Sequence, residues 1–514
     1  MATIPNSQNF PQFSQADIIS EMKKVSNIDI SDFRFYPASQ NRPNEIIKIE
    51  SEENGIVLTF GTVARKALLS YTHETSLHLY KPADATVDTL YLHINIWTDD
   101  IFRVVFSKEK KISNPFSGLP ENARMLIAKP EKVEFTLDET ENKITLTTSK
   151  TEITVDKKTT RISAKFIDGK EFYSQKKQDF RTGDIHDLAL ADSDNDYACF
   201  EALELESDEI IYGLGERFDS LTRNGRTVDF HNKDAVGTTS RRAYINIPFY
   251  LSTKGYGLFL NSGAKTDWQI ATTDLSALQF AVLDSQLDYF VIGGKTPKDI
   301  IKGYCSLTGF SKLPPLWSFG LWMSRNSYVS WDVVDDIAKK VRENDIPCDV
   351  LHLDTAWFNR DWNCDLKFSE ERFPNPEENI DRYKKDGFKI SLWQYNFIPP
   401  NDDNEHYHEA VKYGYLSKDK DGNPYQLPET CQGSWVKDVT IDFSNPDACK
   451  WYADKIKELI KLGACAIKTD FGEGIAEDAV YQNIDGKHFH NLYSLVYNGV
   501  VFDATKSVSG ENIV

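Results

Sequence analysis

The chain has 514 residues, with 59 Lys and Arg against 78 Asp and Glu, so its formal net charge is −19. This acidic balance argues against nucleic acid and anionic lipid as partners, and no run of about eighteen apolar residues predicts a membrane span. The seven cysteines are scattered without a Cys-x-x-Cys pair, so neither a disulfide framework nor a zinc site is expected. Without a signal pattern at the N-terminus, a reducing, cytoplasmic location is predicted.

Residues 1–40 are predicted to be polar and irregular, apart from a helical candidate at 15–25. Beyond them, apolar and polar residues alternate in short runs, as in the hairpin expected from 90–96 and 101–106. Further strands are predicted at 145–148, 151–155 and 161–167. Many short alternating strands are typical of antiparallel sheets packed face to face. We therefore predict a β-sandwich domain over 41–312.

Near Pro314-Pro315 the pattern changes to alternating strands and helices. Strands are expected at 316–322, 348–353, 388–393 and 464–469, and helices at 332–344, 445–463 and 491–503. Such alternation allows a doubly wound sheet or a TIM barrel. The only approach to a dinucleotide-binding motif, Gly213-Leu-Gly215, lacks its third glycine and lies in the β region.

Polar or aromatic residues stand at the C-terminal ends of the four predicted parallel strands, where barrel active sites lie. They are Arg325, Asp354, Trp393-Gln394 and Asp470. We therefore predict that residues 313–514 form the first four βα units of a TIM barrel.

The last predicted strand places Lys468 and Asp470 on the same face, because side chains alternate along a strand. A neighbouring ammonium favours an ionised Asp470, which could attack an anomeric carbon. A purely structural ion pair explains the same spacing equally well. The other strand ends favour the catalytic interpretation.

Asp354 is expected to accept hydrogen bonds from sugar hydroxyls at the same rim. His352 is interpreted as a core histidine with satisfied hydrogen bonds. Trp393 could stack against a sugar or pack in the core, and core packing is favoured for Trp322 and Trp362. Trp357 is likewise a weaker binding candidate for which core packing is favoured, and Glu473 is expected to orient Asp470 or a hydroxyl donor. A metal site formed by the acidic residues is disfavoured because no histidine accompanies them at ligand spacing, and no cofactor is expected.

The chain resembles glycoside hydrolase family 31, in its α-xylosidase-like branch. The resemblance covers about residue 210 to the end and rests on Tyr212-Gly-Leu-Gly-Glu-Arg-Phe218, Arg223-Asn-Gly225, Asn246-Ile-Pro-Phe-Tyr250, Gly255-Tyr-Gly257, His352-Leu-Asp354, Arg372-Phe-Pro-Asn-Pro376, Asp442-Phe-Ser-Asn-Pro-Asp-Ala-Cys-Lys-Trp-Tyr452 and Lys468-Thr-Asp-Phe-Gly-Glu473. It implies a galactose-mutarotase-like β-sandwich followed by a (β/α)₈ barrel.

The same resemblance implies that Asp470 is the nucleophile and that Asp354, Trp393 and Lys468 line the glycone pocket. It also implies that a sandwich loop carrying Asp234 reaches over the site. Lys468 and Phe471-Gly472 favour the xylosidase-like branch over the α-glucosidases, which carry a Trp-x-Asp-Met-Asn-Glu motif there. The expected activity is retaining hydrolysis of terminal α-linked xylose or glucose from a small carbohydrate substrate.

Two departures from the family pattern modify this expectation. Thr355-Ala356 stand where α-xylosidases carry Cys-Phe, which leaves room for a hexose. The acid/base Asp of the family follows a later strand, so we expect it to be absent from this chain. Four strands would also leave an apolar edge unpaired. The sequence thus predicts a barrel truncated within its catalytic domain, with impaired activity or, as the alternative, a non-catalytic carbohydrate-binding remnant. The sequence does not determine the oligomeric state, and a homo-oligomer is one of the alternatives.

Overall fold

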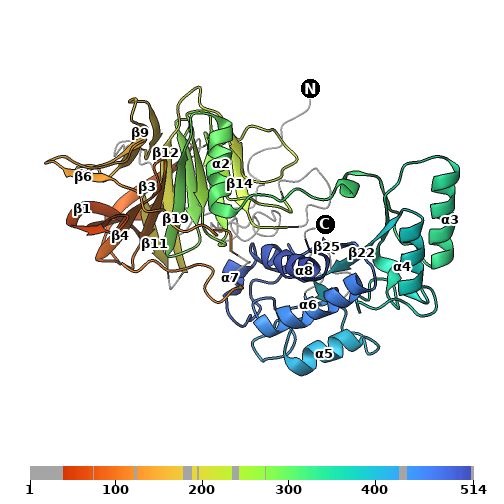
Figure 1. The fold of residues 1–514 in the computed structure, drawn as a ribbon. Helices are drawn as coiled ribbons and strands as arrows, with labels where there is room; N and C mark the ends of the chain where they lie inside the picture. The colour runs from red at the N-terminus through yellow and green to blue at the C-terminus, as the bar shows by residue number, and fades with distance from the viewer. Residues whose placement is uncertain are drawn as a thin grey trace, which may run out of the picture.

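The computed structural model describes residues 39–510, apart from 73–74, 121–123, 177–187, 194–195, 234–241, 273 and 428–436. The helical candidate at 15–25 lies outside the described residues. Figure 1 shows a β-rich N-terminal part followed by a C-terminal part in which helices surround a small sheet. The described helices include none with the length and apolar character that a bilayer crossing requires. The six described cysteines are free thiols.

The larger sheet of the N-terminal part contains fourteen antiparallel strands. They are β1 (Ser39–Glu52), β2 (Gly55–Thr72), β3 (Thr75–Ala83), β4 (Thr89–Thr98), β5 (Ile101–Ser107), β11 (Ala189–Ser193), β12 (Asp196–Glu204), β13 (Ile211–Gly213), β14 (Arg226–Phe230), β15 (Phe249–Ser252), β16 (Tyr256–Leu260), β17 (Thr266–Ile270), β18 (Ala277–Val282) and β19 (Gln286–Gly293). The predicted hairpin is confirmed, because β4 pairs with β5 and Ile94 lies opposite Val104.

A second antiparallel sheet of five strands covers the larger one. Its strands are β6 (Thr136–Glu139), β7 (Lys143–Thr147), β8 (Thr151–Asp156), β9 (Ile162–Phe166) and β10 (Glu171–Ser174). Along β8, buried and partly exposed residues alternate, as expected for a strand with one face toward a core. Ile153 and Val155 belong to the same buried cluster as Leu92 and Val104 of the larger sheet. The sandwich predicted from the alternation is confirmed.

The C-terminal part contains a four-stranded parallel sheet in the order β20-β21-β22-β25. These strands are β20 (Trp322–Met323), β21 (Val350–Leu353), β22 (Lys389–Tyr395) and β25 (Ala466–Asp470), with a small pair, β23 (Phe397–Ile398) and β24 (Val439–Thr440), beside them. The helical elements are α2 (Pro297–Thr308), which ends the sandwich part, η4 (Leu316–Phe319), α3 (Trp331–Glu343), η5 (Thr355–Trp357), α4 (Pro376–Lys385), α5 (Glu405–Tyr413), α6 (Pro446–Lys461), α7 (Gly486–Phe489) and α8 (Tyr493–Ser509).

The order of the parallel strands distinguishes the two folds that the sequence allowed. Each parallel strand lies beside the next one in the chain, without the reversal of order that defines a doubly wound sheet. The first part of a TIM barrel has this sequential order. The α/β part therefore agrees with the predicted fold class.

The predicted first strand at 316–322 is wrong over most of its length. Pro315 is followed by the 3₁₀ turn η4, in which Ser318 N donates to Pro315 O at 3.0 Å and Gly320 N to Trp317 O at 3.1 Å. The first residue of this turn, Leu316, is 87% exposed. Only the two-residue β20 joins the sheet. The prediction failed because a short apolar segment can form either an exposed turn or a buried strand, and its composition alone does not distinguish them.

Two predicted helices are confirmed with their ends close to the expected residues. α3 buries Val334, Ala338 and Val341 along one face and is followed by Asn344. α6 begins at Pro446, with the Asn445 side chain accepting a hydrogen bond from the backbone of its first turn. By contrast, α4 and α5 were not predicted, because each buries only two side chains and has too short an apolar stripe to stand out.

The sandwich and the α/β part meet through the segment that follows β14 and the segment between α7 and α8. Asn232 donates from its backbone to Asn491 Oδ1 at 2.9 Å, and Asn491 Nδ2 donates to Phe230 O at 3.2 Å. A Cβ on Gly263 would meet Leu492 Cγ at 2.4 Å, so the two parts pack closely here. This junction joins the sandwich to the segment that follows β25.

One ion pair across the junction predicts a pH-dependent stability. His488 Nε2 lies 3.4 Å from Asp284 Oδ2, and the hydrogen bond and charge of Asp284 outweigh burial and raise the pKa of His488 above its usual 6.5. A histidine whose pKa is higher in the folded than in the unfolded protein stabilises the folded state. The full contribution is present at pH values below the unfolded-state pKa, and it is lost as the pH rises through the folded-state pKa. We expect Asp284→Asn to lower the melting temperature by about 1–2 °C near pH 6 and by less near pH 8.5. Thermal unfolding at both pH values measures this, and equal shifts would contradict it.

Candidate active site

Neighbouring parallel strands place four of the predicted site residues together. In the register of β22 and β25, Trp393 lies opposite Lys468. Asp470 ends β25, two residues beyond Lys468 and on the same face. Asp354 directly follows β21. The site is therefore built from the C-terminal ends of three adjacent strands.

The Asp470 carboxylate is held by donors from three places. Trp393 Nε1 donates to Oδ2 at 2.8 Å, Lys468 Nζ lies 3.4 Å from the same oxygen, and Phe471 N donates to Oδ1 at 3.1 Å. The side chain nevertheless keeps 38% of its surface exposed. Both Phe471 and Gly472 have positive φ angles, 59° and 107°, and a non-glycine residue in this region is strained. The chain thus turns sharply after β25 and leaves an oriented, accessible carboxylate.

The Asp354 carboxylate faces the same ammonium group. Its Oδ2 lies 3.5 Å from Lys468 Nζ and 3.1 Å from His352 Nε2, and its Oδ1 accepts from Thr355 N at 3.1 Å. Burial by itself would raise the pKa of Asp354, but the His352 hydrogen bond and the Lys468 charge outweigh it and lower the pKa. Asp354 is therefore ionised at neutral pH and can accept hydrogen bonds from hydroxyl groups.

Three tryptophans pack together beside Asp470. Trp393 is 1% exposed, and fully buried Trp357 donates from Nε1 to Trp393 O at 2.8 Å. The predicted binding residue Trp357 therefore supports the backbone of Trp393. Trp362, which we expected to be core, is 36% exposed and packs edge-on against Trp393 with ring centroids 5.2 Å apart. Of its two polar neighbours in the sequence, Asp361 is exposed but Asn363 is buried, so their polarity alone did not signal the exposure of Trp362.

The structure describes three of the remaining predicted residues, Glu473, Arg325 and Trp322. Glu473 is buried, at 7% exposure, three residues beyond Asp470. Arg325 is exposed, with its guanidinium 6.0 Å from the Tyr328 ring. Trp322 on β20 is partly buried, with its ring centroid 5.9 Å from that of Trp317. Asp234 lies outside the described residues.

Gln394, which we expected at the active-site rim together with Trp393, instead belongs to a buried polar network that connects β25 to two helices. Gln394 on β22 is fully buried and donates from Nε2 to Lys468 O at 3.5 Å. Its Oε1 accepts from Tyr497 OH of α8 at 2.8 Å and also from Tyr452 OH of α6. Two helices thereby fix the strand that carries Lys468 and Asp470.

His231, Glu477 and His490 form the group of metal-type side chains found among the described residues, with one ligand atom from each within 4.8 Å of the others. The two imidazole rings are stacked, 4.0 Å apart and 4° from parallel. Metal–imidazole bonds lie in the ring plane, so parallel stacked rings do not converge on one ion. His490 also contacts two backbone oxygens, Ile475 O and Asn232 O, both at 2.8 Å. This geometry supports a structural role at the junction.

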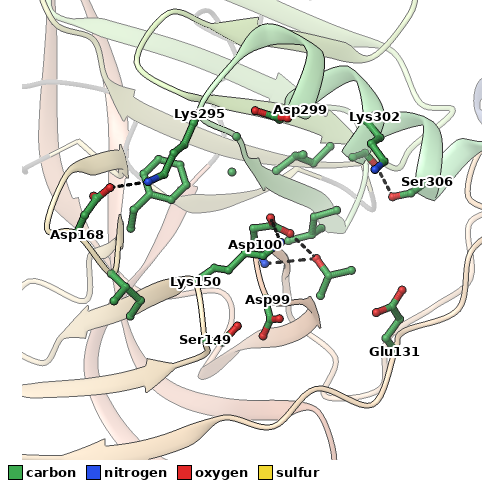
Figure 2. A pocket seen from close by; sticks show the side chains of 18 residues that line it. Asp99, Asp100, Glu131, Ser149, Lys150, Asp168, Lys295, Asp299, Lys302 and Ser306 are labelled. Atoms are coloured by element: carbon green, nitrogen blue, oxygen red, sulfur yellow. Dashed lines mark hydrogen bonds and ion pairs between the residues drawn. The ribbon is translucent and has the colours of Figure 1, made fainter.

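A cavity of about 780 Å³ lies on the sandwich, away from this rim (Figure 2). Two of its lysines form ion pairs, Lys150 with Asp100 at 2.7 Å and Lys295 with Asp168 at 2.8 Å. Its aromatic lining residue, Phe166, is 6% exposed and has the Lys295 ammonium 6.0 Å from its ring centroid. An open aromatic face of the kind that stacks on sugars is lacking here. The Asp470 rim is therefore the better candidate site.

Two family models match the chain. The glycosyl hydrolases family 31 TIM-barrel domain matches residues 311–513, and the glycosyl hydrolase 31 N-terminal galactose mutarotase-like domain matches residues 91–268. The first contains the whole candidate site, and the second matches the sandwich that precedes it.

Curated relatives include enzymes of two named activities. Alpha-xylosidase XylQ of Lactiplantibacillus pentosus is 37% identical over 314 residues, which are 60% of this chain and 40% of that protein. Alpha-glucosidase 2 of Bacillus thermoamyloliquefaciens is 28% identical over 442 residues, which are 82% of this chain and 53% of that protein. The chain therefore spans about 40% to half of the length of these relatives.

Solved structures share the fold at low sequence identity. The cycloalternan-forming enzyme from Listeria monocytogenes, in complex with a pentasaccharide substrate, superposes with a TM-score of 0.76 at 22% identity, over 93% of this chain and 44% of that chain. An α-xylosidase from a soil metagenome, complexed with xylose, gives 0.72 at 18% identity, over 91% and 64%. Both the sandwich and the parallel α/β part thus have counterparts of known structure.

Proposed function

We propose, since the chain belongs to glycoside hydrolase family 31, that its Asp470 rim binds the terminal sugar of an α-linked xyloside or glucoside and that Asp470 is the nucleophile of a retaining glycosidase. The proposal rests on the position and surroundings of the Asp470 carboxylate. It is fixed by Trp393 and Lys468, stands at the C-terminal end of a parallel strand, and remains accessible. A buried structural carboxylate would not need that exposure.

The proposed first step transfers the sugar to the protein. An Asp470 oxygen attacks the anomeric carbon on the face opposite the leaving group, and the bond between that carbon and the leaving oxygen breaks. The leaving oxygen departs as an anion that must take a proton from an acid or from water, and none of the residues named at the rim is assigned to donate it. The product is a β-linked glycosyl ester of Asp470, which water later hydrolyses. The Trp393 N–H and the Lys468 ammonium keep the carboxylate oriented for attack.

The proposed sugar ring lies between Asp354 and Trp362. Asp354 accepts hydroxyl hydrogen bonds, Lys468 donates to them, and Trp362 offers an exposed aromatic face. Thr355 and Ala356 are small side chains beside Asp354. Space there would admit the hydroxymethyl group of glucose as well as the unsubstituted carbon of xylose. The names of the relatives, α-xylosidase and α-glucosidase, support both sugars.

Covalent trapping tests this proposal at its first step. Fluoride leaves without protonation, so 5-fluoro-α-D-xylosyl fluoride and its glucosyl counterpart report on the nucleophile alone. We expect intact-mass analysis to show one added sugar, and peptide mapping to place it on Asp470. Saccharide binding without any adduct would favour the non-catalytic carbohydrate-binding alternative. An adduct on another residue would contradict the assignment of the nucleophile.

A further inference from the structure

His352 makes two side-chain hydrogen bonds that connect β22 to the Asp354 carboxylate. It lies on β21 opposite Ser391, and its Nδ1 is 3.0 Å from Ser391 Oγ. Its Nε2 is 3.1 Å from Asp354 Oδ2. His352 is 5% exposed and Ser391 fully buried, so water does not compete for these contacts. The interpretation as a core histidine with satisfied hydrogen bonds is confirmed, but one of its partners belongs to the candidate site.

The chemistry of the partners determines which ring nitrogen carries the proton. The ionised Asp354 carboxylate only accepts, so His352 Nε2 must carry a hydrogen and donate it. In the neutral ring Nδ1 is then the acceptor, and the Ser391 hydroxyl donates to it. The order of donation is Ser391 to His352 to Asp354.

The donors to Asp354 differ in how firmly they are held. His352 and the Thr355 backbone are buried, whereas the Lys468 side chain is 46% exposed. A flexible lysine can turn toward a ligand, while a ring fixed at both nitrogens cannot. The carboxylate would keep its orientation even while Lys468 donates to a sugar hydroxyl.

We propose that His352 is a positioning residue for Asp354, holding that carboxylate preset to accept glycone hydroxyls when Lys468 turns to the ligand. This inference rests on the proposed function, because it assumes that a sugar occupies the rim. It assigns His352 a part in glycone affinity and none in the attack by Asp470, since its contacts end at Asp354.

Inactivation kinetics with the same glycosyl fluorides measure two quantities separately, the affinity for the sugar and the rate of covalent attack. We expect His352→Met to raise the inhibitor constant KI by about 10-fold, the effect of losing one hydrogen bond to a charged group, with the inactivation rate constant little changed. His352→Gln, whose amide N–H reaches a similar position, should recover most of the affinity. His93→Met is the matched control, because His93 is a buried histidine beside Glu52 in the sandwich; its KI should equal that of the wild type.

A spectroscopic measurement tests the hydrogen bond without any sugar. Protein labelled with ¹⁵N-histidine gives one set of signals that is lost in His352→Gln. These signals should show a ring protonated at Nε2, and Ser391→Ala should alter them. A ring protonated at Nδ1 instead of Nε2, an unchanged KI in His352→Met, or a His352→Gln variant with no better affinity than His352→Met would overturn the proposal.

The same experiments distinguish failure of this proposal from failure of the proposed function. If the wild type neither binds nor labels, the proposed function fails. If the wild type labels and His352→Met labels with the same KI, only the positioning role fails.

Discussion

Asp470→Asn is expected to abolish covalent labelling by the 5-fluoroglycosyl fluorides, whereas the wild type gains one sugar. The amide has nearly the shape of the carboxylate but lacks its nucleophilic charge. It can still accept from Trp393 Nε1, so the surrounding structure should change little. Because no other group is assigned to the attack, the loss should be complete within the detection limit of intact-mass analysis.

The control for this variant is Asp381→Asn, which removes a carboxylate from the exposed surface of α4. It should label like the wild type. Persistent labelling of Asp470→Asn would show that another residue reacts. Loss of labelling in both variants would point to a general effect of removing negative charge from a chain of net charge −19.

Asp354→Asn is expected to weaken saccharide binding by about 10- to 100-fold, because hydrogen bonds to an ionised acceptor are stronger than those to a neutral amide. The variant also removes one of the two carboxylates that face Lys468. Titration calorimetry with xylose, glucose and their α-glycosides measures the loss. Covalent labelling at saturating concentrations of the 5-fluoroglycosyl fluorides should still occur, because Asp470 remains intact.

The comparison of the two variants distinguishes binding from chemistry. Asp470→Asn should bind saccharides while failing to label, and Asp354→Asn should label at high concentration while binding poorly. Equal defects in both assays for both variants would contradict the separate roles assigned to the two carboxylates. Unchanged affinity in Asp354→Asn would remove Asp354 from the glycone site.

Local patterns in the sequence were sufficient for the β-sandwich, for the alternation of strands and helices after it, and for much of the secondary structure. Period-two alternation in β8 and the one-sided apolar face of α3 each report burial directly, because hydrophobic side chains point toward the core. The position of Asp470 at the end of β25 also followed from the chain itself. Short elements with few buried side chains, such as α5, carry too little of this signal, and the apolar turn η4 resembled a strand.

Tertiary structure decided which side chains touch. The sequence placed Lys468 beside Asp470, but only the pairing of β21, β22 and β25 brings Asp354 and Trp393 to the same group. Strand register sets such contacts, and register depends on the whole sheet rather than on any one segment. The sequence alone therefore predicted an ionised carboxylate at Asp470, the proposed nucleophile. The donors that orient Asp470 and Asp354, His352 among them, were determined by the fold.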